Sequence, residues 1–195
     1  MATAALTRYT PEEYLALERN AEFKSEYLDG RIVAMTGASI AHVTITGNVH
    51  GELRTRLRGT PCRPFMGDMR VQIGGGRRYT YPDVVVVCGE PRFMDGALDT
   101  LTNPALIVEV LSPTTEAYDR GEKFQHYRSI ESLREYVLIA QDRVLVERFV
   151  RGGDFWTLST IESLDAALEL TSVDCSIPLR EIYYDVELPA APAVQ

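Results

Sequence analysis

The sequence predicts an α/β protein with a central mixed β-sheet flanked by helices. Two apolar runs rich in β-branched residues, 84–87 and 103–112, are bounded by Pro, Gly and Asn, which is typical of buried strands. Segments with apolar residues at helical spacing lie before and after these runs, at 39–58 and 119–129. Buried strands combined with such helices indicate a sheet covered by helices.

The N-terminal part begins with a helix start signal. Thr10 can cap the helix, Pro11 suits its first position, and two acids follow near its positive end. We expect this helix to continue to about residue 25 or 26, so Glu26 would be a solvated residue at its end. Asp29-Gly30 then predicts a turn before a strand at 31–36.

The second predicted helix, at 39–58, carries residues of three kinds. Val43, Ile45, Val49, Leu53 and Leu57 supply its buried side. Its two histidines, His42 and His50, lie eight residues apart, which is not the spacing of a helical metal pair and favours surface or cap positions. The densest cluster of positive charges lies at the end of this helix and just after it. It can be interpreted either as a solvated surface or as a contact for nucleic-acid phosphates: Arg54, Arg56, Arg58 and Arg63.

Further short strands are predicted at 62–66 and 69–73, with a glycine-rich hairpin turn at 74–76. That turn lacks the Gly-Lys-Ser/Thr ending of a phosphate-binding loop. Later strands are expected at 135–140, 143–150, 155–158 and 167–173, and the last eight residues, 188–195, are expected to form a disordered tail.

Two carboxylates lie in or beside the buried strands. Asp83 directly precedes the first run, and Glu109 lies in the middle of the second. An acid inside an apolar strand is costly unless its charge is compensated. On the following helix, Asp119, Lys123 and Tyr127 are four residues apart and share one face. Two acids on adjacent strands with a nearby lysine suggest a divalent-metal site for phosphodiester cleavage.

The order and spacing of these residues resemble the Uma-type endonuclease family of the PD-(D/E)xK superfamily. The likeness runs from about Tyr9 to about Val150 and includes Tyr-Leu-Asp-Gly at 27–30, Pro82-Asp83 and Ile-Val-Glu-Val-Leu-Ser-Pro at 107–113. The resemblance implies a restriction-endonuclease-like fold, DNA as substrate, Mg²⁺ or Mn²⁺ as cofactor and a homodimer. It also implies catalytic or metal-binding roles for Asp83, Glu109, Lys123, Glu26 and the backbone carbonyl of Val110.

One position departs from the superfamily pattern, which has a lysine two residues after the glutamate. Here that position is Leu111, and Lys123 is the candidate replacement. If no cation reaches the site, the chain would instead be a catalytically silent module that keeps the fold and binds nucleic acid or another protein. The structural alternative is a buried ion pair of the two acids with Lys123.

Composition limits the remaining possibilities. The 195 residues predict one domain, at 1–187. A net charge of −8 and a pI of about 5.0 count against a protein that coats nucleic acid nonspecifically. Three scattered cysteines predict reduced thiols, and neither a signal peptide nor a membrane span is expected. We therefore expect a cytoplasmic protein.

Overall fold

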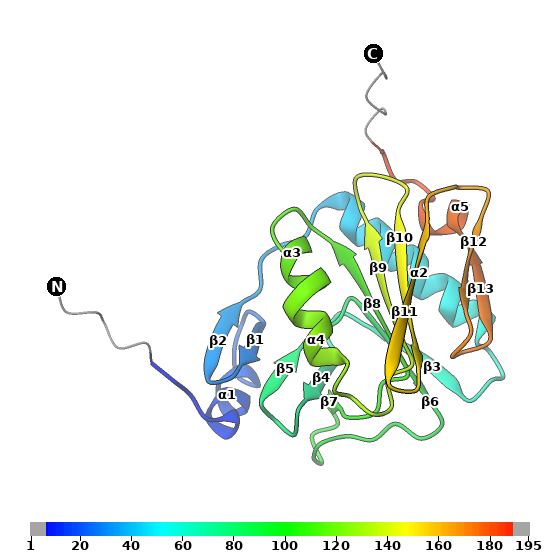
Figure 1. Cartoon of the computed structure of the whole chain (residues 1–195). Helices are drawn as coiled ribbons and strands as arrows, with labels where there is room; N and C mark the ends of the chain where they lie inside the picture. Colours follow the sequence, from blue (N-terminus) through cyan, green and yellow to red (C-terminus); the bar gives the residue numbers. More distant parts are fainter. Residues whose placement is uncertain (1–6, 189–195) are drawn as a thin grey trace.

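A computed structural model describes residues 7–188, and its centre is a six-stranded mixed β-sheet (Figure 1). Across the sheet the strands are β11 (Phe155–Ile161), β10 (Val146–Gly152), β9 (Glu135–Ala140), β8 (Leu106–Leu111), β6 (Val84–Cys88) and β3 (Cys62–Met66). Strands β8 and β9 run parallel, and the other neighbours run antiparallel. The predicted mixed sheet is confirmed. The predicted tail, apart from its first residue, lies outside the described residues.

Helices cover both faces of this sheet because its strands are apolar on both sides. Helix α2 (Ile40–Arg56) packs on the face formed by alternate residues such as Val84, Val86 and Val108. Its N-cap is Ser39, the residue at which the predicted helix begins. Val43, which we expected to be buried, is exposed. Figure 1 shows α2 behind the sheet and the green helical segment in front of it.

The helical segment in front is not a uniform α-helix. It consists of α3 (Glu116–Tyr118), the π-helix η1 (Asp119–Lys123) and α4 (Phe124–Tyr127). Phe124 and Tyr127 pack on the face of the central sheet that carries Val85 and Ile107. Single π-turns inside helices are rare and often occur at functional sites. This one contains both Asp119 and Lys123.

A second sheet of five strands, which the sequence analysis did not separate from the first, lies beside the helical segment. Its strands, in spatial order, are β2 (Arg31–Ala34), β1 (Ser25–Leu28), β5 (Arg78–Thr80), β4 (Arg70–Ile73) and β7 (Thr100–Leu101). Helix α1 (Pro11–Glu18) packs on it through Tyr14, whose ring stacks on those of Tyr27 and Tyr79. The meeting of the two sheets positions the candidate site.

The predicted extent of the first helix is wrong. Its start is confirmed, because Thr10 and Glu13 form a reciprocal capping box. However, α1 ends at Glu18, and residues 25–28 form strand β1 instead of a helix end. The predicted turn at Asp29-Gly30 joins β1 to β2, with φ values of 47° and 93° that suit a tight hairpin.

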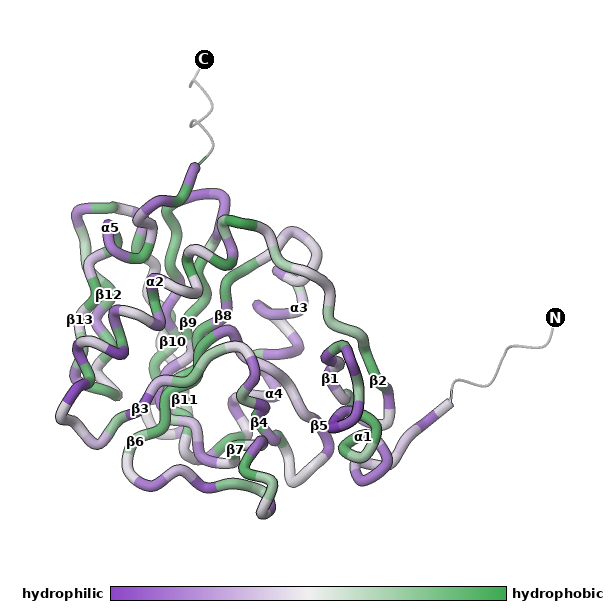
Figure 2. Tube along the Cα trace, turned by 180° about the vertical axis from the view of Figure 1, so that it is seen from behind, coloured by the Kyte–Doolittle hydropathy of each residue, from purple (hydrophilic) through white to green (hydrophobic). Residues whose placement is uncertain are grey.

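The C-terminal part closes the face that α2 covers. Hairpin β12 (Ala167–Leu170) and β13 (Cys175–Pro178), followed by α5 (Leu179–Ile182), buries Leu168, Ile177 and Ile182 against it. The tube in Figure 2, seen from behind, is hydrophobic along the central strands and more polar along the outer turns. The predicted strand at 167–173 is thus shorter than expected, because the chain turns back at 171–174.

The expectation of three reduced cysteines is also wrong. The antiparallel register of β3 and β6 places Cys62 directly opposite Cys88, and the structure joins them in a disulfide. Cys175 is free and half-buried. Within residues 7–188, no helix combines the length and the apolar character that crossing a membrane requires.

Candidate active site

The register of two central strands brings Asp83 and Glu109 together. Val84 pairs with Val108 across β6 and β8, so Asp83, just before β6, lies beside the position of Glu109. Because strand residues alternate between faces, Glu109 points away from α2, in line with Ile107 and Leu111. Its side chain reaches the helical segment η1–α4. The two carboxylates therefore lie as the sequence predicts.

Asp83 is held by two hydrogen bonds. The backbone N–H of Val110 donates to Oδ2 at 2.7 Å, and Nε2 of His42 lies 2.8 Å from Oδ1. Since an ionised carboxylate only accepts, Nε2 of His42 carries the proton in this contact. The side chain of Asp83 is 21% exposed, so it stands at the solvent side of the site. The predicted ligand role of the Val110 carbonyl stays a prediction.

Lys123 reaches Glu109 from η1, as predicted, but among the described residues it forms no ion pair with Asp83 within 4.0 Å. Its Nζ lies 2.9 Å from Oε1 of Glu109 and 3.3 Å from Oδ1 of Asp119, its partner four residues earlier. Lys123 is only 7% exposed. The ammonium therefore lies beside Glu109, although it comes from η1 and position 111 on β8 is leucine.

Glu26 joins this group, so of the two positions considered for it, a solvated helix end and a place among the site acids, the structure has the second. It lies on β1, is 9% exposed, and its Oε1 is 3.7 Å from Nζ of Lys123. The backbone N–H of Tyr81 donates to the same oxygen at 3.3 Å. The second sheet thus contributes an acid to the site, in agreement with the implication of the family resemblance.

His42 lies at the site, although its spacing from His50 favoured a surface or cap position and only the family resemblance offered a place near the site mouth. The side chain is 17% exposed and contacts Asp83, because the N-terminus of α2 meets the start of β6. Ser39 caps the helix by accepting the backbone N–H of His42, which fixes this first turn. The sequence carries no signal for this contact, since 41 residues separate the two side chains.

Tyr127 supports Glu109 from α4. Its hydroxyl donates to Oε1 of Glu109 at 2.9 Å and lies 3.0 Å from the Thr80 hydroxyl, which can donate to it in turn. Tyr127 is fully buried. A chain of hydrogen bonds therefore links the second sheet, the helical segment and the central strand.

Replacing Tyr127 with phenylalanine should lower the free energy of unfolding by about 1–3 kcal/mol, because a buried donor is lost and the Thr80 hydroxyl loses its partner. Urea denaturation measures this change. Tyr184→Phe is the matched control; Tyr184 is exposed, and the loss there should stay within about 0.5 kcal/mol. Equal effects in both variants would contradict the supporting role of Tyr127.

Negative charge exceeds positive charge around Lys123. Burial raises the pKa of the Glu109 carboxyl, and the charges of Asp83 and Asp119 raise it further against the effect of Lys123. Burial alone would lower the pKa of Lys123, but Glu109 and Glu26 outweigh it and raise that pKa well above its usual value. Lys123 therefore stays protonated, and one ammonium faces three carboxylates.

The donor set fits a hard divalent cation. The two oxygens of a carboxylate offer about four lone-pair positions, so the bonds to Asp83 leave room for a metal. Oε2 of Glu109 forms no hydrogen bond with any of the residues 7–188. The Tyr118 hydroxyl, whose pKa is raised by burial and by nearby Glu26, is buried without a partner in the described part of the chain.

These residues offer a two-carboxylate site rather than a full protein cage. Across residues 7–188, no group of three or more His, Cys, Asp or Glu side chains is arranged to hold a metal. Mg²⁺ tolerates such a site, because it usually keeps several waters and binds through one or two carboxylates. Asp83 and Glu109 fit that requirement.

Two other charged groups lie outside the site. Lys24 binds Asp68, with Nζ and Oδ1 separated by 2.6 Å at the surface. The arginine cluster lies at the far end of α2: Arg56 is fourteen residues beyond His42, which is about 21 Å along the helix. The arginine cluster therefore does not form part of the group around Asp83 and Glu109.

Comparisons with known proteins agree with this geometry. The family model described as "Uma2: Putative restriction endonuclease" matches residues 11–179. Two uncharacterised proteins of Synechocystis sp. (strain ATCC 27184 / PCC 6803 / Kazusa), sll1609 and slr1290, are each 37% identical to the chain. The first alignment covers 88% of this chain and 97% of sll1609, and the second covers 93% of this chain and 94% of slr1290.

A solved structure shares the fold. It is described as a putative nuclease belonging to DUF820 from Anabaena variabilis ATCC 29413, and it superposes with a TM-score of 0.75. The match covers 90% of this chain and 97% of that one at 19% sequence identity. At this identity the likeness concerns the fold.

Proposed function

The chain belongs to the Uma2 family of putative restriction endonucleases, and on this premise we propose that it hydrolyses DNA phosphodiester bonds with a divalent metal ion, Mg²⁺ or Mn²⁺. The restriction-endonuclease-like fold class is confirmed by the likeness to the Anabaena structure. The substrate, the cofactor and the roles of individual residues are part of the proposal.

The excess of buried carboxylates around Lys123 carries this proposal. Glu109, Asp119 and Glu26 lie within 3.7 Å of one ammonium, and Asp83 adds a further charge beside Glu109. Buried charges without compensation are costly, so this arrangement favours an additional cation. If Lys123 served only to form a stabilising ion pair, one carboxylate would be enough, whereas three lie within 3.7 Å of its ammonium.

Each residue has a proposed task in the reaction. Asp83 and Glu109 would hold the metal, whose charge neutralises the phosphate and lowers the pKa of an attacking water. His42 and the Val110 N–H hold the Asp83 carboxylate in one orientation. Since its neighbours keep Lys123 protonated, it is better suited to donating hydrogen bonds to a phosphate oxygen than to acting as a base.

The alternative, a catalytically silent module, is favoured by Leu111 at the superfamily lysine position and by the acidic pI. Against it stands the 2.9 Å contact of Lys123 with Glu109, which supplies the missing cation from η1. The contact makes the nuclease the better-supported of the two functions.

A plasmid cleavage assay tests the proposal. Supercoiled DNA should be nicked or linearised in Mg²⁺ or Mn²⁺ but not in EDTA, and Asp83→Ala should abolish the reaction because a metal ligand is lost. Asp68→Ala removes a carboxylate that is 91% exposed and should keep full activity. Cleavage that persists in Asp83→Ala would contradict the role of Asp83 as a metal ligand. Absence of cleavage by wild type under all metal conditions would favour the silent module.

A further inference from the structure

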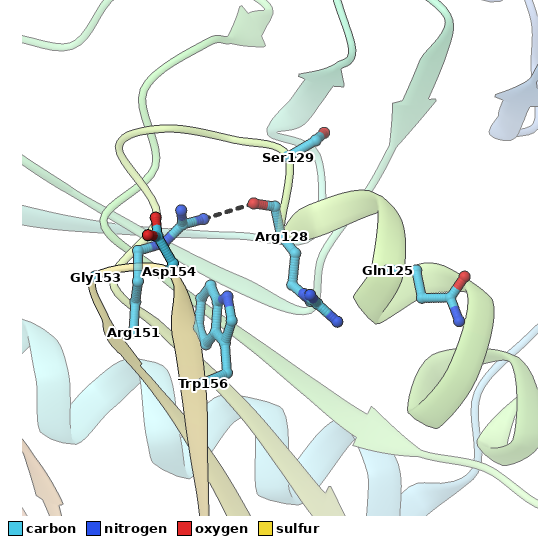
Figure 3. A pocket seen from close by; sticks show the side chains of 7 residues that line it. All are labelled: Gln125, Arg128, Ser129, Arg151, Gly153, Asp154 and Trp156. Carbon is cyan, nitrogen blue, oxygen red and sulfur yellow. Dashed lines mark hydrogen bonds between the residues drawn. The ribbon is translucent and has the colours of Figure 1, made fainter.

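A cavity of about 520 Å³ lies away from the acidic site, between the end of α4 and the turn that joins β10 to β11 (Figure 3). A volume of this size is typical of sites for whole ligands and exceeds what a single ion needs. The side chains that line it are mostly hydrogen-bonding groups, namely Gln125, Arg128, Ser129, Arg151, Asp154 and Trp156. Figure 3 shows the side chains of Arg151 and Trp156 side by side at this turn.

Arg151 is fixed in place on the cavity wall. Its Nη2 donates to the carbonyls of Arg128 at 2.6 Å and Ile130 at 3.0 Å, and its guanidinium lies 4.7 Å from the centroid of the Trp156 ring. Its Nε is buried without a hydrogen-bond partner among residues 7–188. With Nη2 bonded to two carbonyls and Nε shielded from solvent, Nη1 is the nitrogen of Arg151 that stays available to an acceptor in the cavity.

Positive charge gathers at this end of the molecule. Burial lowers the pKa of Arg151, and the charges of Arg134 and Arg128 lower it further. In the described part of the chain, none of these three arginines forms an ion pair with a carboxylate within 4.0 Å. Other arginines of this acidic protein are paired, as Arg148 is with Glu135. The cavity is therefore suited to an anion.

We propose that this cavity binds backbone phosphates of a nucleic acid strand, through Arg128 and Arg151. The Arg128 guanidinium can match phosphate oxygens with paired donors, and Arg151 adds its positive charge and the donors of Nη1. Gln125 and Ser129 add neutral donors on the same wall. Asp154 is the one lining group that would oppose an anion.

The position of the cavity favours a strand over a small anion. Arg128 follows Lys123 by five residues on the same helical segment, which is about 7.5 Å along the axis. A strand bound at the candidate active site could therefore extend as far as this cavity, whereas a small anion would not use that proximity. The proposal that the cavity binds phosphates rests on the proposed nuclease function. It adds a second region of the protein that would hold the substrate.

Binding of a fluorescein-labelled DNA duplex in EDTA, followed by anisotropy at low salt, tests this site without cleavage. Arg128→Gln keeps the carbonyl that holds Arg151 and should weaken binding by at least ~10-fold, with a shallower salt dependence. Asp154→Asn should strengthen binding, since it removes the opposing charge. Arg180→Gln is the matched control, because Arg180 is exposed on α5, and it should change affinity less than about two-fold.

The outcomes separate this site from the nuclease activity. Equal affinities of Arg128→Gln and Arg180→Gln, or no duplex binding by wild type, would overturn the phosphate site even if plasmid cleavage is intact. If inorganic phosphate or pyrophosphate raises the melting temperature of wild type but not of Arg128→Gln, while DNA is not bound, the cavity is a small-anion site and the assignment is again wrong. Weaker duplex binding by Arg128→Gln together with stronger duplex binding by Asp154→Asn would support the phosphate site, even if the protein does not cleave DNA.

Discussion

Replacing Lys123 with methionine should lower the rate of plasmid cleavage by ~10²–10³, the usual cost of removing one positioned donor from a charged transition state. Lys123 is the ammonium that the described structure places within 4.0 Å of Glu109, and methionine has a similar length without the charge. The same change should increase the stabilisation that Mn²⁺ gives, since three carboxylates then lack their cation. Single-turnover cleavage and melting curves with and without Mn²⁺ measure the two effects.

The control for this variant is Lys24→Met. Lys24 lies near the second sheet but binds exposed Asp68, so its loss should leave cleavage and the Mn²⁺ effect unchanged. Removing one partner of a buried ion pair costs about 3–5 kcal/mol, and Mn²⁺ should restore part of that loss in Lys123→Met. A larger loss of cleavage in Lys24→Met than in Lys123→Met would assign the catalytic cation to Lys24 instead.

Addition of Mg²⁺ or Mn²⁺ to the metal-free protein should raise its melting temperature. A ligand that binds only the folded state stabilises it by about 2.7 kcal/mol at 100 times its Kd. For a chain of this size that corresponds to roughly 5–11 °C. Glu109→Gln keeps the shape of the side chain but removes its charge, so the metal effect should disappear, whereas Asp68→Asn should retain it. Unchanged melting of wild type at saturating Mn²⁺ would contradict the metal site.

This metal effect should depend on pH. Burial and the neighbouring charges of Asp83 and Asp119 raise the pKa of Glu109, so the folded protein holds this proton more tightly than the unfolded chain does. In EDTA the stability from this group is therefore present at low pH and is lost as pH rises through the raised pKa. Protons compete with metal for the carboxylate, so stabilisation by Mn²⁺ should grow from mildly acidic to mildly alkaline pH. Melting curves at several pH values measure both trends, and the second trend should vanish in Glu109→Gln.

Local sequence patterns were sufficient to predict an element where the residues of that element alone determine its conformation. The Val84–Val87 run and the strand around Glu109 are buried strands, because continuous β-branched residues have few other stable environments. The cap at Thr10 was readable because its side chain satisfies a backbone group a few residues away. The same local approach misplaced residues 25–28, where pairing with the next strand at 31–34 and with the distant strand at 78–79 decides the conformation.

The residues of the candidate site likewise fall into those that the sequence predicts and those that only the structure identifies. Asp83, Glu109 and Lys123 were predictable, since an acid in an apolar strand and a helical i, i+4 pair are visible in the sequence. His42 and Tyr127 were not predictable as their partners, because those contacts depend on how α2 and α4 sit on the central sheet. The disulfide of Cys62 and Cys88 likewise follows from the register of β3 and β6.

The sequence by itself determined the α/β class, the central strands and the identity of the acidic residues, because these follow from periodicity and from the cost of placing a charge among apolar side chains. Only the tertiary structure decided which charges meet. It placed Glu26 of the second sheet beside Lys123 and left the arginine cluster at the far end of α2. Electrostatic interactions depend on distance in space and on burial, and for residues far apart in the chain both are set by packing of the two sheets and their helices.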